Sequence, residues 1–142
     1  MPDILHKISI NAPRERVYAA LATVDGLAGW WTSTTSGESK PGETLEFRFG
    51  KHVCRMRVEA QQQGAHVAWL CTDDTGEWEG TRLTFDLLED AGRTTLLFGH
   101  RAWREGSQFF AHCSMKWATF LLSLRELVES GTGRPFPRDV QI

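Results

Sequence analysis

One histidine in this 142-residue sequence is placed where it could do chemistry. His100 lies in the segment GRTTLLFGHRAW, whose alternation puts it on the same side as Leu96 and Phe98. An inward imidazole there could orient a polar group of a ligand or act as a general base, which makes His100 a candidate catalytic residue. The competing interpretation is a structural histidine held by hydrogen bonds or one at the rim in water, and we favour it because a general base needs a defined geometry. His6 and His52 have the same inward parity.

The three cysteines form a second candidate cluster. Cys54 and Cys71 are predicted to lie opposite each other on adjacent strands, and Cys113 falls on the apolar stripe of a later helix. Three thiolates and an imidazole could bind zinc, but the sequence contains neither a CxxC nor an HxxxH spacing. We therefore expect small buried apolar groups, with no metal site and no cofactor. The odd count and wide spacing also favour reduced thiols and a cytoplasmic location over a secreted disulfide scaffold.

Large aromatic rings are the third feature with functional potential. Six tryptophans and eight phenylalanines accompany a single tyrosine, which fits either a bulky core or the lining of a ligand cavity. Trp30 and Trp31 adjoin in the stretch GLAGWWTS, and neighbours on a helix point about 100° apart. We predict that Trp30 anchors the helical segment and that Trp31 faces a pocket or its mouth. Trp78 and Trp103 lie in loops that could border the same mouth.

Strand and helix patterns indicate the elements that must position these residues. Residues 3–10 alternate as a strand, and a helix beginning near Pro13 follows. Residues 27–31 can form one more short helix. Residues 32–43 are polar and contain Gly and Pro, which predicts a loop.

Five further strands are predicted after this loop, and their turns fix their registers. The three proposed turns place apolar residues on one face and arginines on the other, which predicts an antiparallel sheet with one apolar face. The turns are Gly50-Lys51, pairing Phe47 with Cys54; Gln62-Gln63, pairing Met56 with Trp69 and Cys54 with Cys71; and Asp90-Ala91, pairing Phe85 with Leu96 and Thr81 with His100.

A long C-terminal helix is predicted from about Gly106 to Ser130. Ser107 can cap its start and Gly131 can end it. Lys116 falls mostly off the apolar stripe of this helix. The stripe itself consists of Phe110, Cys113, Trp117, Phe120, Leu121, Leu124 and Val128.

Composition and charge narrow the classes of partner. The formal net charge is −2 and no block of Lys or Arg is present, so neither nucleic acid nor an anionic membrane is an expected partner. No apolar run approaches the ~20 residues of a membrane-spanning helix, and no signal peptide is visible at the N-terminus. The length suits a single domain over residues 1–142.

Several segments, in their order along the chain, resemble the START-like helix-grip superfamily (SRPBCC), and within it the heat-shock-protein-90 ATPase activator homologues. They are INAPRERVYAAL (10–21), GLAGWW (26–31), PGETLEFRF (41–49), MKWATFLLSLRELVESG (115–131) and GRPFP (133–137). The resemblance implies an α+β fold in which a curved six-stranded antiparallel sheet wraps around a long C-terminal helix, with two short helices after the first strand. It also implies a hydrophobic pocket, and it supplies no universal catalytic set. The sequence departs from the family pattern at GHRAWREG, residues 99–106.

These observations favour a binding module for a small hydrophobic or aromatic ligand, held between the sheet and the C-terminal helix. No catalytic set is identified, and we do not expect an enzyme. One alternative is a chaperone-linked interaction protein that stimulates a heat-shock ATPase in a stress response, and another is a pocket enzyme of the cyclase or hydrolase type. The protein is expected to be a monomer or a homodimer. The predicted ligand-binding residues are Trp31, Phe47, Met56, Trp69, Phe85, Phe98, His100, Phe110, Cys113 and Trp117.

Overall fold

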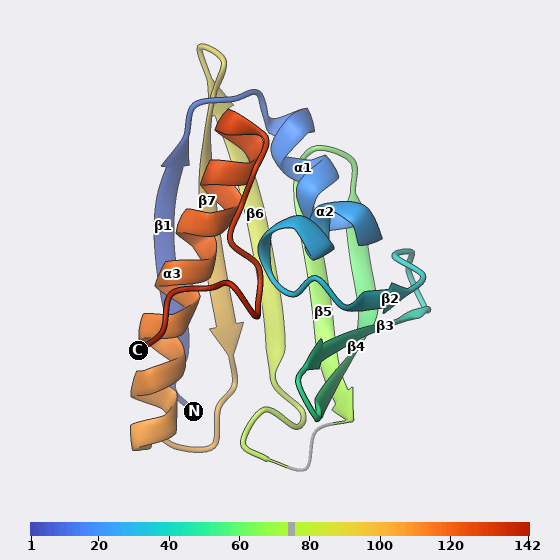
Figure 1. Cartoon of the computed structure of the whole chain (residues 1–142), viewed down its shortest axis with the longest axis vertical. Coiled ribbons are helices and arrows are strands. Elements are labelled where there is room, and N and C mark those ends of the chain that lie inside the picture. Colours follow the sequence, from blue (N-terminus) through green and yellow to red (C-terminus); the bar gives the residue numbers. More distant parts are fainter. Residues whose placement is uncertain (74–75) are drawn as a thin grey trace.

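A computed structural model describes residues 1–73 and 76–142. Three helices and seven strands occur in these ranges (Figure 1). In chain order they are β1 (Ile4–Ile10), α1 (Arg14–Ala22), α2 (Val24–Trp30), β2 (Thr35–Gly37), β3 (Thr44–Phe49), β4 (His52–Gln62), β5 (His66–Asp73), β6 (Arg82–Asp90), β7 (Arg93–Arg101) and α3 (Gln108–Ser130).

The strands form one antiparallel sheet in the order β1-β7-β6-β5-β4-β3-β2. All three helices lie on the same face of this sheet, with α3 along the β1–β7 side and the α1–α2 pair beside it (Figure 1). After α3 the chain turns back and runs between α3 and α2. This arrangement confirms the predicted α+β fold, with two short helices after the first strand and a long C-terminal helix on the sheet.

The sheet has one strand more than the six expected, because β2 lies within the predicted loop 32–43. β2 is an edge strand of three residues, and Thr35 pairs with Phe47 of β3. Its residues are all polar or glycine and none is fully buried. An edge strand of this kind leaves no apolar alternation in the sequence, so a pattern search reads it as a loop.

The register of the first hairpin is as predicted, whereas the second is displaced by two residues at Met56 and Val58 and by three at residues 60–62, beyond a bulge. Phe47 pairs with Cys54 across β3 and β4. Met56 pairs with Cys71 rather than with Trp69, and Cys54 and Cys71 are therefore not register partners. The turn lies further along the chain than Gln62-Gln63, at Gly64, whose φ of 72° suits glycine. Because the displacement at Met56 and Val58 is two residues, both side chains stay on their predicted face.

The β6–β7 hairpin is displaced in the same way. Its turn is Ala91-Gly92, where both residues have positive φ (52° and 78°), as a two-residue type I′ turn requires. Phe85 consequently pairs with Phe98 rather than Leu96, and His100 pairs with Leu83 rather than Thr81.

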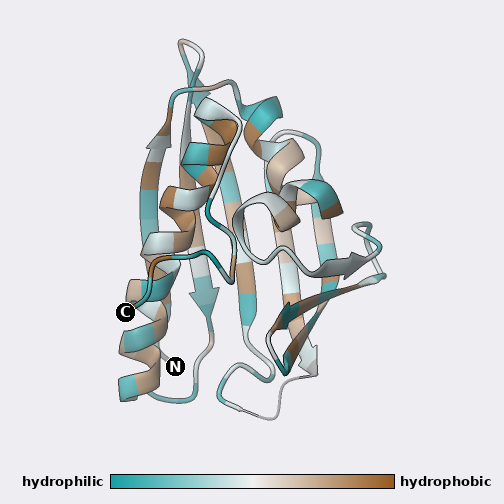
Figure 2. Cartoon of the chain, viewed as in Figure 1, coloured by the Kyte–Doolittle hydropathy of each residue, from teal (hydrophilic) through white to brown (hydrophobic). Residues whose placement is uncertain are grey.

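The inner face of the sheet is apolar and the outer face is charged. Hydrophobic and hydrophilic residues alternate along the strands in Figure 2, as a half-buried antiparallel sheet requires. On the outer face Arg55 binds Glu46 at 2.7 Å, and Arg82 binds Glu59 at 2.9 Å. The hydrogen bond from Arg82 is the main cause that lowers the pKa of Glu59. Because these pairs are partly exposed, each contributes little stability.

The helices begin and end as local chemistry dictates. The Ser107 hydroxyl accepts a hydrogen bond from the Phe110 amide at the start of α3, and Gly131 ends the helix in the left-handed conformation, both as predicted. Two residues later Gly133 passes between α2 and α3. A Cβ there would lie 2.5 Å from the Gly29 carbonyl oxygen and 2.9 Å from that of Ser123.

The two adjacent tryptophans are both buried but have different neighbours. The Trp30 indole N–H donates to the Ala20 carbonyl at 2.9 Å and so ties α2 to α1. The Trp31 ring centroid lies 4.3 Å from that of Phe47 and 5.0 Å from that of Trp117. Trp31 therefore joins the sheet to α3.

Candidate functional site

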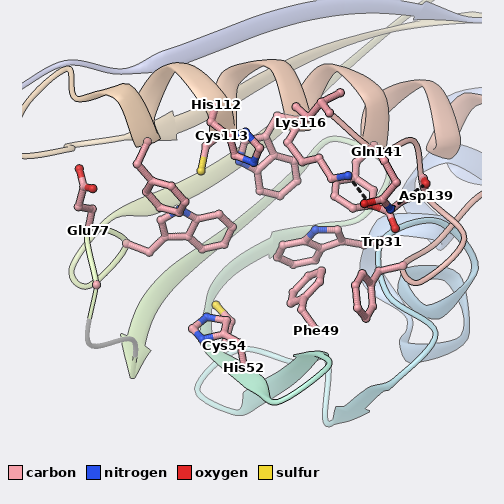
Figure 3. Close-up of a pocket in the computed structure, with 17 residues that line it drawn as sticks. Trp31, Phe49, His52, Cys54, Glu77, His112, Cys113, Lys116, Asp139 and Gln141 are labelled. Atoms are coloured by element: carbon pink, nitrogen blue, oxygen red, sulfur yellow. Dashed lines mark hydrogen bonds and ion pairs between the residues drawn. The ribbon is translucent and has the colours of Figure 1, made fainter.

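A pocket of about 540 Å³ lies between α3, the β3–β4 hairpin, the loop before β6 and the C-terminal segment (Figure 3). Its walls come from segments far apart in the sequence. The lining residues are Trp31, Phe49, His52, Cys54, Gly76, Glu77, Trp78, Phe109, His112, Cys113, Lys116, Trp117, Phe120, Phe136, Asp139, Gln141 and Ile142.

Three tryptophans form a continuous aromatic wall of this pocket. The Trp31 ring stacks with Trp78 at a centroid distance of 6.3 Å, and Trp78 stacks with Trp117 at 6.0 Å. Phe49 packs edge-on against Trp31 at 5.5 Å. Such a surface offers flat π-faces to an aromatic or otherwise apolar guest.

The acidic and lysine side chains of the pocket lie at two ends, and His52 and His112 lie between them (Figure 3). Figure 3 shows Lys116 and Asp139 at one end and Glu77 at the other. Lys116 forms an ion pair with Asp139. The Ser107 hydroxyl donates a 2.5 Å hydrogen bond to Glu77, which attaches the loop before β6 to the start of α3.

His100 lies behind the aromatic wall and has no exposed surface. The Trp117 indole N–H donates to His100 Nδ1 at 3.0 Å. Because an indole nitrogen can only donate, Nδ1 is the acceptor and the ring proton is on Nε2. Nε2 lies 2.8 Å from the Thr81 hydroxyl oxygen, which in turn donates to the Trp78 carbonyl at 2.5 Å.

Burial lowers the pKa of His100 to about 3, so the imidazole is neutral at physiological pH. Both of its nitrogens are used within the protein, and its ring contacts Trp78 edge-on at 4.8 Å. The geometry therefore makes His100 a support for two pocket-lining tryptophans, and it offers neither nitrogen to a substrate.

The predicted ligand-binding residues divide between the pocket and the core behind it. Trp31, Cys113 and Trp117 line the pocket. Phe110 packs instead against Trp103, with centroids 5.2 Å apart. The others do not line this pocket but belong to the close-packed core: Phe47, Met56, Trp69, Phe85, Phe98 and His100.

Sequence reasoning did not select most of the lining. His52 was singled out for its inward parity and Trp78 for its place in a loop, and both line the pocket. Lys116 and Asp139 carried no such signal. Lys116 lies off the apolar stripe, and Asp139 follows the helix in a segment without periodicity, so only the folded course of that segment brings them together.

The three thiols are not gathered with other possible ligands into a metal-binding cluster among the described residues. The Cys54 and Cys71 sulfur atoms are 4.0 Å apart, and the three cysteines are buried and form no disulfide. Within residues 1–73 and 76–142, no group of three or more His, Cys, Asp or Glu side chains could hold a metal ion. Across the same residues, no helix is both long and apolar enough to cross a membrane.

The sheet, the two-helix insertion, the long C-terminal helix and the aromatic pocket define a protein of the START-like helix-grip class (SRPBCC). The chain belongs to the family described as Activator of Hsp90 ATPase homolog 1-like protein, whose sequence model matches residues 11–129. A search of curated proteins finds no match.

Solved structures agree with this assignment. The solution structure of the Aha1 dimer from Colwellia psychrerythraea is 39% identical, with a TM-score of 0.87, over 94% of this chain and 100% of that one. A Staphylococcus saprophyticus protein is 19% identical (TM-score 0.78), over 93% of this chain and 95% of its own. A Bacillus halodurans protein is 22% identical (TM-score 0.77), over 91% and 98%. The last two similarities concern the fold alone.

Proposed function

We propose that this protein binds a small hydrophobic or aromatic ligand in the pocket between α3 and the sheet. The observation that carries the proposal is the stacked wall of Trp31, Trp78 and Trp117 along a cavity of about 540 Å³. That volume is within the range of small-molecule sites. In this proposal residues 1–142 act as one domain, and the buried thiols suit a reducing, cytoplasmic setting.

A neutral fluorescent probe tests this proposal without involving charge. N-phenyl-1-naphthylamine brightens when it leaves water, so its titration should show one saturable site. The Cys113→Phe variant places a large ring in the pocket and should abolish the signal. Met115→Phe, on an exposed position of the same helix, is the matched control and should bind as the wild type does. A wild-type protein that gives no signal, or a Cys113→Phe variant that binds unchanged, would contradict the proposal.

A second candidate function follows from the family. Its name describes homologues of an activator of the Hsp90 ATPase, and the Colwellia relative is called Aha1. In this alternative the chain stimulates a heat-shock ATPase through its surface, and pocket variants have no effect. The measurement is the ATPase rate of the heat-shock protein from the same cell, with and without this protein. An unchanged rate and no co-purification would exclude this alternative.

The Colwellia protein was solved as a dimer, and a homodimer is therefore our proposal for this chain. Sedimentation velocity at several concentrations distinguishes the dimer from a monomer. A pocket enzyme of the cyclase or hydrolase type is less well supported, because both nitrogens of the candidate base His100 are occupied.

A further inference from the structure

Lys116 binds a carboxylate of the protein itself at one end of the pocket. It projects from α3, and its side chain is 21% exposed. Its ammonium group binds the Asp139 carboxylate and the Val140 carbonyl oxygen, and it lies 5.3 Å from the centre of the Phe120 ring. The carboxylate now on Lys116 comes from the protein itself, so the geometry for an anion is already in place.

Asp139 is a poorly satisfied occupant of that site. Its side chain is only 3% exposed, and Oδ1 is buried with no hydrogen-bond partner among the described residues. A buried carboxylate that lacks part of its hydrogen bonding is costly, and the ion pair offsets that cost only in part. The Lys116–Asp139 pair, which we call the latch, therefore contributes less stability than a fully hydrogen-bonded pair would.

The segment that carries Asp139 is attached to the fold mainly through this latch. Within the described part of the chain, the hydrogen bonds and ion pairs that join residues 139–142 to other segments all come from Lys116. Phe136, three residues before Asp139, is held more firmly, since its amide donates to the Trp31 carbonyl at 2.8 Å and its carbonyl accepts from the Ser33 amide at 3.1 Å. Release of Asp139 can thus free residues 139–142 while Phe136 stays in place.

The rest of the pocket limits what can replace Asp139. The wall beside Lys116 is aromatic, and the acidic Glu77 lies at the far end (Figure 3). A ligand with an aromatic body and one carboxylate can lay its ring on the tryptophans and direct its charge to Lys116, away from Glu77. A neutral ligand would leave the latch closed, and a cationic one would be repelled by Lys116.

We propose that the pocket selects small aromatic carboxylates, whose carboxylate takes the place of Asp139 on Lys116 and releases residues 139–142. This inference rests on the proposed ligand-binding function and adds the class of ligand to it. Residues 139–142 are then an internal competitor, so the apparent affinity depends on the fraction of molecules in which the latch is open.

Two probes that differ in one group test the inference. 2-Naphthoate and 2-naphthamide share a ring system and a shape, but only naphthoate is charged. Calorimetric titration of the wild-type protein should give naphthoate at least about tenfold higher affinity, the effect of one charge-assisted hydrogen bond. The Lys116→Met variant should bind both probes equally and keep its affinity for naphthamide. Lys116→Arg should retain the preference for naphthoate. Lys40→Met, which changes an exposed lysine paired with Glu38, is the matched control.

The Asp139→Asn variant shows whether Asp139 competes with the ligand for Lys116 or holds Lys116 in position for it. If Asp139 competes, removal of its charge should strengthen naphthoate binding about threefold or more, whereas an Asp139 that positions Lys116 for the ligand would make the variant weaker. Asp90→Asn, an exposed aspartate, should change neither affinity. Thermal unfolding of each variant shows whether it is folded before it is titrated.

The outcomes distinguish the two proposals. If naphthamide binds as tightly as naphthoate, or if the preference survives in Lys116→Met, the protein is a ligand binder but the carboxylate inference is wrong. If Asp139→Asn weakens naphthoate binding, displacement of the latch is wrong. If neither naphthalene probe nor the neutral naphthylamine binds to the wild type or to Asp139→Asn, both the inference and the proposed function fail.

Discussion

The buried His100 makes the free energy of unfolding of this protein depend on pH, and this dependence can be measured. His100 is neutral in the fold because Trp117 donates to its Nδ1 and because its side chain has no exposed surface. Protonation of Nδ1 would replace that hydrogen bond with a contact between two donors. The pKa is about 3 in the folded protein and about 6.5 in an unfolded chain.

The sign and size of the effect follow from these two pKa values. Between pH 6.5 and pH 3 the unfolded chain binds a proton at this residue that the folded protein does not bind. The stabilisation is therefore complete above pH 6.5 and is lost as the pH falls toward 3. The loss is about 1.4 kcal/mol per pH unit within that window, or about 2.7 kcal/mol between pH 7.5 and pH 4.5. The second figure hardly changes if the folded pKa is as high as about 4.

Urea unfolding followed by tryptophan fluorescence at pH 7.5 and pH 4.5 provides the assay. The wild type and His100→Gln share every other titrating group, so the difference between their losses isolates His100. Gln supplies one donor and one acceptor but binds no proton, and the variant should lose about 2.7 kcal/mol less than the wild type on acidification. His112→Gln, at an exposed position of α3, should behave as the wild type. Equal losses in the wild type and His100→Gln would refute the assignment of a neutral, buried imidazole.

Two further substitutions test the packing of α2 against its neighbours. Gly26→Ala should destabilise the protein by about 2 kcal/mol or more in thermal unfolding, because the new Cβ would lie 2.6 Å from the backbone of α1. Gly106→Ala is the control and should be close to neutral, because its Cβ would meet open space. Ser123→Ala should cost about 2 kcal/mol in urea unfolding, since the Ser123 hydroxyl donates to the Trp30 carbonyl at 2.9 Å and accepts from the Arg134 amide at 2.7 Å. A loss below about 0.5 kcal/mol would show that neither bond contributes.

Periodicity was sufficient to predict which face of each strand is buried, but it did not fix the register. In β6 and β7 the alternation places Phe85, Phe98 and His100 inside for any even displacement of the strands. The register depends on the turn, and Ala91 is a residue whose positive φ no simple rule anticipates. The prediction that His100 lies near Thr81 nevertheless agrees with their 2.8 Å contact, because diagonal neighbours on adjacent strands can also touch.

The pocket was harder to predict than the fold, for a physical reason. Alternation assigns Phe47 and Trp69 to the interior but does not say whether an interior position borders empty space or another side chain. That depends on the packing of α2, α3 and the C-terminal segment together, and here the core around Phe47 and Trp69 is filled. One end of the pocket is formed by the ion pair of Lys116 with Asp139, a contact between distant parts of the sequence that no local pattern encodes.

The close passage of Gly133 bears on what the binding site requires of the rest of the fold. The gap that Gly133 occupies is formed by the carbonyls of Gly29 on α2 and Ser123 on α3, and it exists only when these two helices are already packed together. The segment after α3 therefore reaches its native position only in a structure in which α2 and α3 are packed together. Phe136, Asp139 and Ile142 belong to that segment and line the pocket, so the complete binding site depends on the packing of α2 against α3, although neither Gly29 nor Ser123 lines it.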